Sequence, residues 1–472
     1  FRLHTRFMGS TAAQQLTLVC AAGFLLRVCV WAFYGQTSSI GFHHPVKSFK
    51  RITEALFLDS AGLSPYGAHT FFQPPLVLAP FWIPAQLWQS SSGYSDVLSL
   101  LWGRFVFAAA DVVTAVGLAK FTRAHDRFHF TSNPGAAAAA LYLLNPINVM
   151  SCNALALDCL YRPILAFGLL SAYEGSIVAA SLLLAVGVYV DLANLALFIP
   201  TCILLAQSRQ YMEGLLTCVA HGLLFAVFLG QLWYISYAML GDSWEALLRI
   251  YATQHSYTDF TPHWGVYWYF FQQMFSDLRS FWVWFLNCHA CTYALPLFCR
   301  VHVLPSAGVL LYTLYLGVGT MLAPYPSLAD VAFYTTLAVL GHPAYVAGLK
   351  VGFVCTYTGF VLLFLGPVFY LSWVVSGTGN ANFFYFVTLA FNMCQVWFLK
   401  DLLVQAIVEA RAVEKVLAAE RAVQEREEEE REAEEARRRA EEEARAEKQA
   451  AEEQQTGRRG PRKRGKIFFT RD

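Results

Sequence analysis

Charged residues are scarce in this chain of 472 residues. Lys, Arg, Asp and Glu together make up 14% of it, whereas apolar residues make up 56% and aromatic residues 15%. This composition excludes a soluble globular domain, which needs more charge on its surface. The chain also lacks any Asn-x-Ser/Thr acceptor, so we expect no N-linked glycan on it. The high apolar and low charged content indicates a polytopic membrane protein.

Apolar runs of about 20 residues, the length that crosses a bilayer, recur from Ala12 to Leu403. We predict an all-α polytopic membrane protein with about ten to twelve transmembrane helices. We expect the first run to be a span and not a removable signal peptide, because Arg27 interrupts it and no clear cleavage site follows. The expected spans are Leu16–Phe33, Leu98–Ala119, Ala136–Met150, Leu155–Leu170, Val178–Leu205, Leu215–Leu240, Phe281–Phe298, Val303–Leu322, Val331–Val346, Val351–Val374 and Phe383–Leu403.

The apolar segment Phe71–Trp88 is unusually rich in proline. Proline removes a backbone donor and disrupts a regular helix. The segment is therefore as compatible with a re-entrant or partly buried element as with a full span. Its prolines are Pro74, Pro75, Pro80 and Pro84.

Charged residues are concentrated at the C-terminal end of the chain, and this change in composition divides the chain into three regions. We predict a multispanning membrane domain over 1–404 with a lumenal loop over 35–70, a charged helix over 405–457, and a basic disordered tail over 458–472. Basic residues between spans, such as Lys120 and Arg123, place both ends of the chain in the cytosol by the positive-inside rule.

The predicted charged helix is almost wholly Glu, Arg, Ala, Gln and Lys. Glu427 with Arg431 and Glu434 with Arg438 are spaced as helix-stabilising i,i+4 pairs. Few apolar residues stand at heptad positions, which favours a lone solvated helix over a coiled coil. The basic tail suits either a solvated disordered end or contact with anionic head groups.

Eleven cysteines occur, most of them inside apolar runs. There they act more often as small apolar residues than as disulfides. The pair Cys288 and Cys291 has metal-like spacing, but it lacks a second pair, so packing is the favoured interpretation. We expect no metal site, no cofactor and no nucleic-acid partner.

Two acids lie inside apolar sequence, Asp111 and Asp330. An ionisable residue inside a span is a functional candidate by default. A paired structural role is comparably plausible, with Arg104 or Arg162 as the partner.

The sequence Asp259-Phe-Thr261-Pro262 is typical of a helix start, with Asp or Thr as the N-cap and proline at the first helical position. The aromatic stretch that follows, from Trp264 to Phe271, is more often an interfacial belt than a binding site.

A second polar stretch begins at Asn380 and Asn382, after the irregular Ser376-Gly-Thr-Gly379. Carboxamides there can donate to phosphate or sugar oxygens. The following Phe383, Phe384 and Tyr385 can contact acyl chains or anchor the interface. Helix capping by the asparagines is the alternative.

The loop from Ser64-Pro-Tyr66 to Leu76 resembles the first lumenal loop of multispanning dolichol-phosphate-mannose-dependent mannosyltransferases. In those enzymes a pair of acids after the first span handles the sugar phosphate. Here Gly35–Phe49 contains no acid. Glu54 and Asp59 come later, on an expected amphipathic helix. The resemblance implies a mannosyltransferase-like (GT-C-like) bundle without its catalytic acids.

The chain up to about Leu403 further resembles the class U subunits of the glycosylphosphatidylinositol (GPI) transamidase. The matching pieces are Gly62-Leu-Ser-Pro-Tyr66, Asp111-Val-Val-Thr114-Ala115, Leu141-Tyr-Leu-Leu-Asn145-Pro146, Leu197-Phe-Ile-Pro200, Asp259-Phe-Thr261-Pro262, Tyr325-Pro326 with Asp330-Val331-Ala332, Gly379-Asn380-Ala-Asn382-Phe-Phe-Tyr385 and Phe391-Asn392.

The resemblance implies a non-catalytic subunit of the endoplasmic-reticulum complex, with no catalytic residues of its own. Its partners would be the other transamidase subunits, including the caspase-like cysteine protease subunit, and the GPI lipid. Asn380, Asn382, Phe383, Phe384, Tyr385 and Asn392 are the implied lipid contacts. Asp111, Asp259, Thr261, Pro262 and Asp330 are structural or partner candidates.

The rival hypothesis is an active lipid-linked mannosyltransferase of GPI biosynthesis. It would use Glu54 or Asp59 as the base, with Ser64–Leu76 holding the donor. A transporter would instead predict matching interrupted helices in two halves, and we see none in the sequence.

Overall fold

The computed structural model describes residues 2–35, 41–42, 46–67, 71–87, 96–207, 209–256, 260–304 and 306–457. Within these ranges the chain is helical, and extended backbone pairs only at an isolated bridge between Ser48 and Ala156. The all-α prediction is confirmed.

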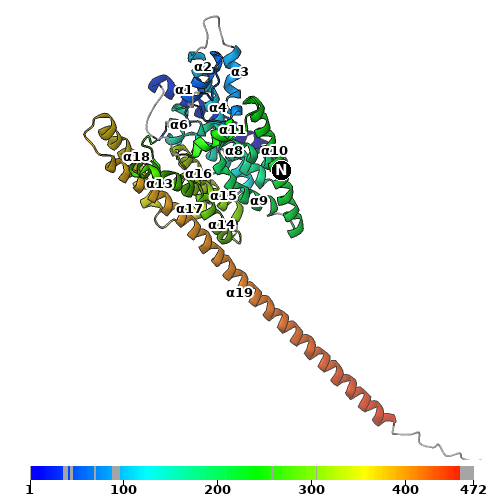
Figure 1. Cartoon of the computed structure of the whole chain (residues 1–472). Coiled ribbons are helices and arrows are strands. Elements are labelled where there is room, and N and C mark those ends of the chain that lie inside the picture. Colours follow the sequence, from blue (N-terminus) through cyan, green and yellow to red (C-terminus); the bar gives the residue numbers. More distant parts are fainter. Residues whose placement is uncertain are drawn as a thin grey trace, which may run out of the picture. The chain divides into compact units, whose positions relative to one another are not determined.

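The helices follow one another along the chain (Figure 1). Their bounds are α1 (Arg2–Tyr34), α2 (Phe49–Ser60), η1 (Pro75–Val77), α3 (Ala79–Leu87), α4 (Asp96–His125), α5 (Pro134–Leu143), α6 (Pro146–Asn153), α7 (Asp158–Tyr173), α8 (Ile177–Val190), η2 (Leu192–Leu197), α9 (Phe198–Ala206), α10 (Tyr211–Met239), α11 (Trp244–His255), α12 (Tyr267–Gln273), α13 (Ser276–Asn287), α14 (His289–Val301), α15 (Ala307–Met321), α16 (Leu328–Gly341), α17 (Pro343–Ala347), α18 (Gly352–Tyr370), η3 (Leu371–Val375) and α19 (Ala381–Gly457).

Five helices of the described chain are long and apolar enough to cross a membrane, or six if the bent pair α5 and α6 counts as one span. Four further apolar helices have 10–17 residues each. The number of about ten to twelve spans therefore remains a prediction, based on the length of the apolar runs.

Several predicted spans are broken into shorter helices. The predicted span Val178–Leu205 is divided into α8, η2 and α9, and the break is at Asp191. The carboxylate of Asp191 accepts a hydrogen bond from the backbone N–H of Ala193 at 3.0 Å. An acid that caps the following turn starts a new helix in place of continuing the old one.

The predicted span Ala136–Met150 is bent by 53° between α5 and α6. Asn145 caps α6 through a 3.0 Å bond from the N–H of Ile147, and Pro146 occupies its first turn. Proline cannot donate to the preceding helix, so α5 ends here. The predicted spans Phe281–Phe298 and Val331–Val346 are likewise divided, at Cys288 and at His342.

The proline-rich segment 71–87 forms the 3₁₀ turn η1 and the nine-residue helix α3. Such a helix is far shorter than the roughly 20 residues that cross a bilayer. Phe71, Val77 and Phe81 are buried against the bundle. The partly buried alternative therefore describes the part of this segment that the structure covers.

The chain divides into two compact units, Phe1–Ala406 and Ile407–Asp472. In the second unit α19 continues to Gly457, and the side chains over 411–451 are exposed. The predicted basic tail over 458–472 lies outside the described residues, as do the side chain of Cys291 and the loop stretches 36–40, 43–45 and 68–70.

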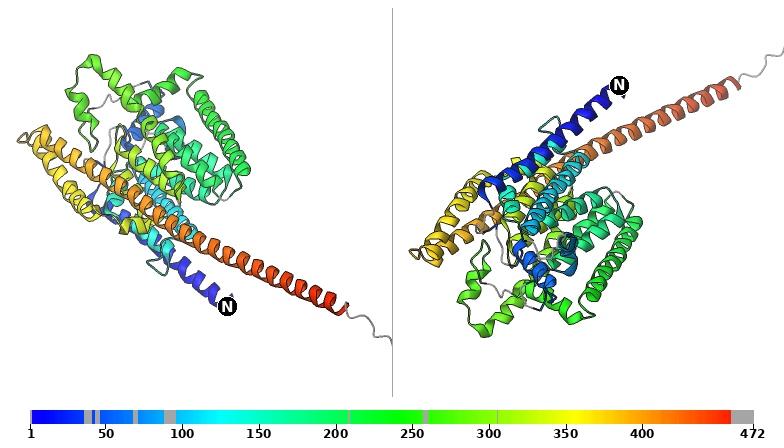
Figure 2. Two further views of the ribbon diagram at one scale, coloured as in Figure 1. Left: turned by 90° about the horizontal axis from the view of Figure 1, so that it is seen from below. Right: turned by 90° about the horizontal axis from the view of Figure 1, so that it is seen from above.

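In the first unit α4 is the central helix, in contact with α1, α5 and α7. In its most apolar 18-residue stretch, 56% of the residues are buried. The corresponding shares are 17% in α1, 22% in α10 and 17% in α18. Figure 2 shows the helices of this unit from two sides. The outer helices expose rows of large apolar residues, such as Leu216 and Leu223 on α10, which suits contact with lipid.

A buried network of charges joins the central helices. Arg27 of α1 and Asp111 of α4 form an ion pair at 2.8 Å, with both side chains 0% exposed. Tyr142 of α5 donates to Asp111 at 3.0 Å, and Arg162 of α7 lies 3.4 Å from the Tyr142 hydroxyl. The partner of Asp111 is therefore Arg27, and not the Arg104 or Arg162 that we expected.

We predict that Asp111→Asn strongly destabilises the protein. It leaves the guanidinium of Arg27 buried without its counter-charge, which costs about 3–5 kcal/mol. The measurement is thermal unfolding of the detergent-solubilised chain. Glu245→Gln is the control, because it breaks the exposed pair with Arg249 and costs at most about 1 kcal/mol. Equal melting of the two variants would contradict the prediction.

Candidate functional site

The amide–aromatic site is the group formed by Asn380, Asn382, Phe383, Phe384 and Tyr385 together with Trp268 and Tyr269. It lies where α18 gives way to α19. Helix α18 ends in the π turn η3, and residues 376–380 are irregular. Gly377 has a φ of +67°, a left-handed conformation that favours glycine. This turn brings the start of α19 back beside the end of α18.

Both asparagines are exposed and stand at the start of α19. The Asn380 side-chain oxygen accepts from the Asn382 backbone N–H at 2.9 Å, so this asparagine does cap the helix. The Asn382 carbonyl accepts a short hydrogen bond from the Tyr269 hydroxyl. Because both bonds use the amide oxygens, the amide N–H groups are oriented away from these contacts and can donate elsewhere.

The aromatic members of the site pack on one another in stacked and tilted arrangements. Tyr385 stacks on Tyr269 at a centroid distance of 4.4 Å, and Phe384 lies 5.8 Å from Trp268. Phe384 is fully buried, whereas Phe383 is 56% exposed. The indole N–H of Trp268 is buried and has no hydrogen-bond acceptor among the described residues. The site thus has a fixed aromatic base and an exposed apolar edge.

Asn392, which lies further along α19, is buried under this site. Its amide group donates to the carbonyl of Trp264 at 2.9 Å and of Thr388 at 2.8 Å. Its oxygen lies 3.3 Å from the Gln395 amide nitrogen. These bonds use the whole carboxamide, so the structure places Asn392 as a support for Trp264 below the amide–aromatic site.

The expected helix start at Thr261 and Pro262 is wrong. Residues 260–266 are not helical, and α12 begins at Tyr267 with Val266 as its N-cap residue. Asp259 lies outside the described residues. Trp264 is held in this irregular segment by close approach to Gly366, where a Cβ would lie 2.5 Å from the indole ring. Tertiary packing around Trp264 thus overrides the local capping signal.

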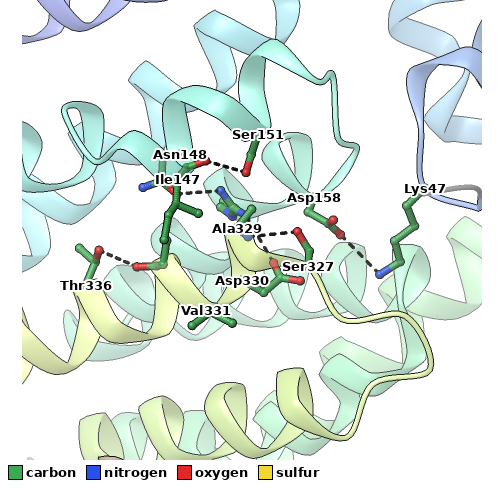
Figure 3. A network of polar contacts seen from close by, with 12 residues as sticks. Lys47, Ile147, Asn148, Ser151, Asp158, Ser327, Ala329, Asp330, Val331 and Thr336 are labelled. Atoms are coloured by element: carbon green, nitrogen blue, oxygen red, sulfur yellow. Dashed lines mark hydrogen bonds and ion pairs between the residues drawn. The ribbon is translucent and has the colours of Figure 1, made fainter. Parts of the chain in front are cut away.

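The charged cavity is a second candidate site, formed by Lys47, Asp158, Arg162, Asp191 and Asp330. It encloses about 90 Å³, and Tyr161, Tyr315, Tyr325 and Phe333 also line it. Figure 3 shows Lys47 and Asp158 pointing toward each other and Asp330 beside Ser327 at the start of α16. Segments far apart in the sequence supply these groups.

Lys47 lies between two carboxylates of the charged cavity. Its Nζ is 2.9 Å from Asp191 and 3.5 Å from Asp158. Burial alone lowers the pKa of Lys47, but the charges of Asp191, Asp158 and Asp330 outweigh it and hold this pKa well above its usual value. The ammonium is therefore charged and fixes the connection after α1 to the starts of α7 and η2.

Arg162 and Asp330 form the looser pair of the charged cavity. The guanidinium Nη2 lies 3.6 Å from the Asp330 carboxylate. Arg162 is one of the two partners that we named for the intramembrane acids, and it also contacts the Tyr142 hydroxyl. Through Tyr142 and Arg162 the charged cavity is connected to the buried Arg27–Asp111 pair.

The residues predicted from the sequence as functional candidates do not include Lys47, Asp158 or Asp191. The signal was present, because Asp158 and Asp191 also lie inside predicted spans, the criterion that selected Asp111 and Asp330. Lys47 is separated from Asp191 by 144 positions, and only the fold brings them together.

Glu54 and Asp59 lie on α2, which confirms the predicted short helix. Glu54 pairs with Arg51 at 3.0 Å, and Asp59 accepts from the indole N–H of Trp82 at 2.7 Å. Both carboxylates therefore have local partners outside the charged cavity.

Comparison with known proteins finds one matching family over most of the chain. The model of the family described as GPI transamidase subunit PIG-U matches residues 21–391. The GPI-anchor transamidase component PIGU of Homo sapiens is 27% identical over 389 residues, which cover 76% of this chain and 85% of that protein. The GPI transamidase component GAB1 of Saccharomyces cerevisiae is 26% identical over 403 residues, covering 84% and 94%.

We predict that Asn392→Ala destabilises the protein by about 1–3 kcal/mol, because it removes the buried hydrogen bonds that this carboxamide makes with the Trp264 carbonyl and the Gln395 amide. Thermal unfolding followed by tryptophan fluorescence measures this. Met393→Ala is the matched control, since the neighbouring Met393 is exposed and its loss changes stability by at most about 0.5 kcal/mol. Indistinguishable melting of both variants would refute the supporting role.

Proposed function

Because this chain belongs to the family of GPI transamidase subunit PIG-U, we propose that it is a non-catalytic subunit of the transamidase of the endoplasmic reticulum. Its task is to bind the GPI lipid and to position it for attachment to the C-terminus of precursor proteins. Bound geometry replaces a bimolecular encounter, so positioning alone has a large effect on rate.

The observation that carries this proposal is the mixed chemistry of the amide–aromatic site. Asn380 and Asn382 present exposed carboxamides, which donate to phosphate or sugar oxygens. The exposed ring of Phe383 lies beside them and offers apolar surface to acyl chains. A glycolipid needs polar and apolar contacts of this kind side by side.

Transamidation itself needs an activated thiol and a base. We assign these to a separate caspase-like cysteine protease subunit, which is the partner that the family resemblance implies. In this arrangement the present chain holds the lipid, and the terminal amine of the GPI reaches the acyl-enzyme of the partner. The chain would cross the membrane several times, with its charged helix in the cytosol.

We expect the double variant Asn380→Ala with Asn382→Ala to lower anchor attachment about thirtyfold, since the two lost hydrogen bonds contribute about 1 kcal/mol each and about 2 kcal/mol together. The measurement is a surface reporter of GPI anchoring in cells that lack the endogenous subunit. Native pull-down should recover the other subunits unchanged.

Gln424→Ala is the matched control for this double variant, because it removes an exposed carboxamide from the same helix outside the site. It should leave the reporter unchanged. Equal reporter levels in the double variant and the wild type would remove the amide–aromatic site from the proposal.

The second candidate function is the lipid-linked mannosyltransferase, favoured by the resemblance of the Ser64–Leu76 loop. It requires Glu54 or Asp59 as a free base. Both are engaged locally, with Arg51 and Trp82. We therefore expect the purified chain to transfer no mannose from dolichol phosphate mannose to an acceptor glycolipid. Transfer by the wild type that Glu54→Gln or Asp59→Asn abolishes would establish the rival function.

A further inference from the structure

The charged cavity contains a buried guanidinium, that of Arg162, two of whose nitrogens have no hydrogen-bond acceptor within the described part of the chain. The side chain of Arg162 is 1% exposed, and its Nε and Nη2 donate no hydrogen bond to any residue that the structure describes. Its Nη1 has two long contacts, at 3.4 Å to Tyr142 and to Asn148. A buried guanidinium without close acceptors is costly. An acceptor that enters the charged cavity would meet these N–H groups.

The charged cavity also holds more carboxylates than cations. Among the described residues that line it, the three carboxylates of Asp158, Asp191 and Asp330 stand with two cations, Lys47 and Arg162. Lys47 is shared by Asp158 and Asp191. Asp330 is left with a 3.6 Å contact to Arg162, which is longer than a hydrogen bond. Asp330 is also the most exposed of the five, at 32%, so a donor can reach it.

We propose that the charged cavity binds a head group that carries both an ammonium and a phosphodiester, as an ethanolamine-phosphate group does. The ammonium donates to the Asp330 carboxylate, and a phosphodiester oxygen accepts from Nη2 and Nε of Arg162. Both contacts are charge-assisted hydrogen bonds, which are about twice as strong as neutral ones. A purely anionic ligand would satisfy Arg162 but meet three carboxylates.

The size of the charged cavity fits a head group and not a whole lipid. Its volume of about 90 Å³ is several times the roughly 10–15 Å³ that one water needs. It is well below the roughly 300–1,000 Å³ of pockets that enclose complete ligands. The remainder of a lipid would lie outside the charged cavity.

This inference goes beyond the proposed function, because it concerns different residues and holds for any lipid or glycoside with this head group. Two kinds of molecule carry this head group, a glycolipid with an ethanolamine phosphate and the membrane phospholipid phosphatidylethanolamine. Both present the same primary ammonium next to a phosphodiester.

The test is native mass spectrometry of the full chain in detergent, titrated with dihexanoyl lipids that differ only in head group. We expect dihexanoyl-phosphatidylethanolamine to bind at least about fivefold more tightly than the phosphatidylglycerol analogue, which has no ammonium to donate to Asp330. The phosphatidylcholine analogue should bind as weakly, because its quaternary ammonium has no N–H. Equal binding of all three would overturn the proposal without any variant.

Asp330→Asn should reduce binding of the phosphatidylethanolamine analogue at least about fivefold and leave the phosphatidylglycerol analogue unchanged. Asp277→Asn on α13 is the matched control, because Asp277 is exposed and lies outside the charged cavity. Wild-type binding of the phosphatidylethanolamine analogue by Asp330→Asn would also overturn the proposal.

The ethanolamine-phosphate ester of methyl mannoside serves as a second probe. Tighter binding of this ester than of dihexanoyl-phosphatidylethanolamine would assign the site to a glycolipid, and the reverse order to a membrane phospholipid. The head-group series tests the charged cavity, and the anchoring reporter tests the amide–aromatic site, so either proposal can be refuted without the other. Uniform head-group binding combined with a weakened Asn380 and Asn382 double variant would refute only the charged cavity.

Discussion

The bundle depends on the buried ion pair between Arg27 and Asp111. Charges without partners are expensive away from water, and this pair stands at the packing contact between α1 and α4. Tyr142 and Arg162 extend it toward Asp330 at the start of α16. Helices that share this network must adopt one relative arrangement, because a small displacement would leave a charge unpaired. The polar network therefore specifies which helix faces meet, a task that uniform apolar packing performs poorly.

Helix α16 connects the two candidate sites within the first unit. Leu328 and Val331 pack in the apolar cluster with Trp264, Val387 and Phe391, below the amide–aromatic site. Other residues of the same helix, Asp330 and Phe333, line the charged cavity. The hydroxyl of Tyr334 also donates to Gln395 of α19 at 3.1 Å. Helix α16 thus supplies side chains to the surroundings of both candidate sites.

Composition and the length of the apolar runs were sufficient to predict the helical membrane class and the positions of α4, α10 and α18. They did not predict where apolar runs break, because the breaks arise from capping by single side chains, such as Asn145 and Asp191. The pairing of Asp330 with Arg162 could be predicted from the sequence, since few cationic residues lie in apolar sequence. The pairing of Arg27 with Asp111 could not be predicted in this way, because it depends on the tertiary arrangement of distant helices. The same holds for the charged cavity.

The division of an apolar stretch into α8 and α9 also leaves two helices that are too short to cross a bilayer alone. With 14 and 9 residues these helices measure about 21 and 14 Å, less than the roughly 30 Å hydrocarbon thickness. Both pack against the longer helix α10. The polar break between them at Asp191 is neutralised by Lys47, which lies 144 positions earlier in the chain. We therefore expect α8, α9 and α10 to fold as one cooperative unit.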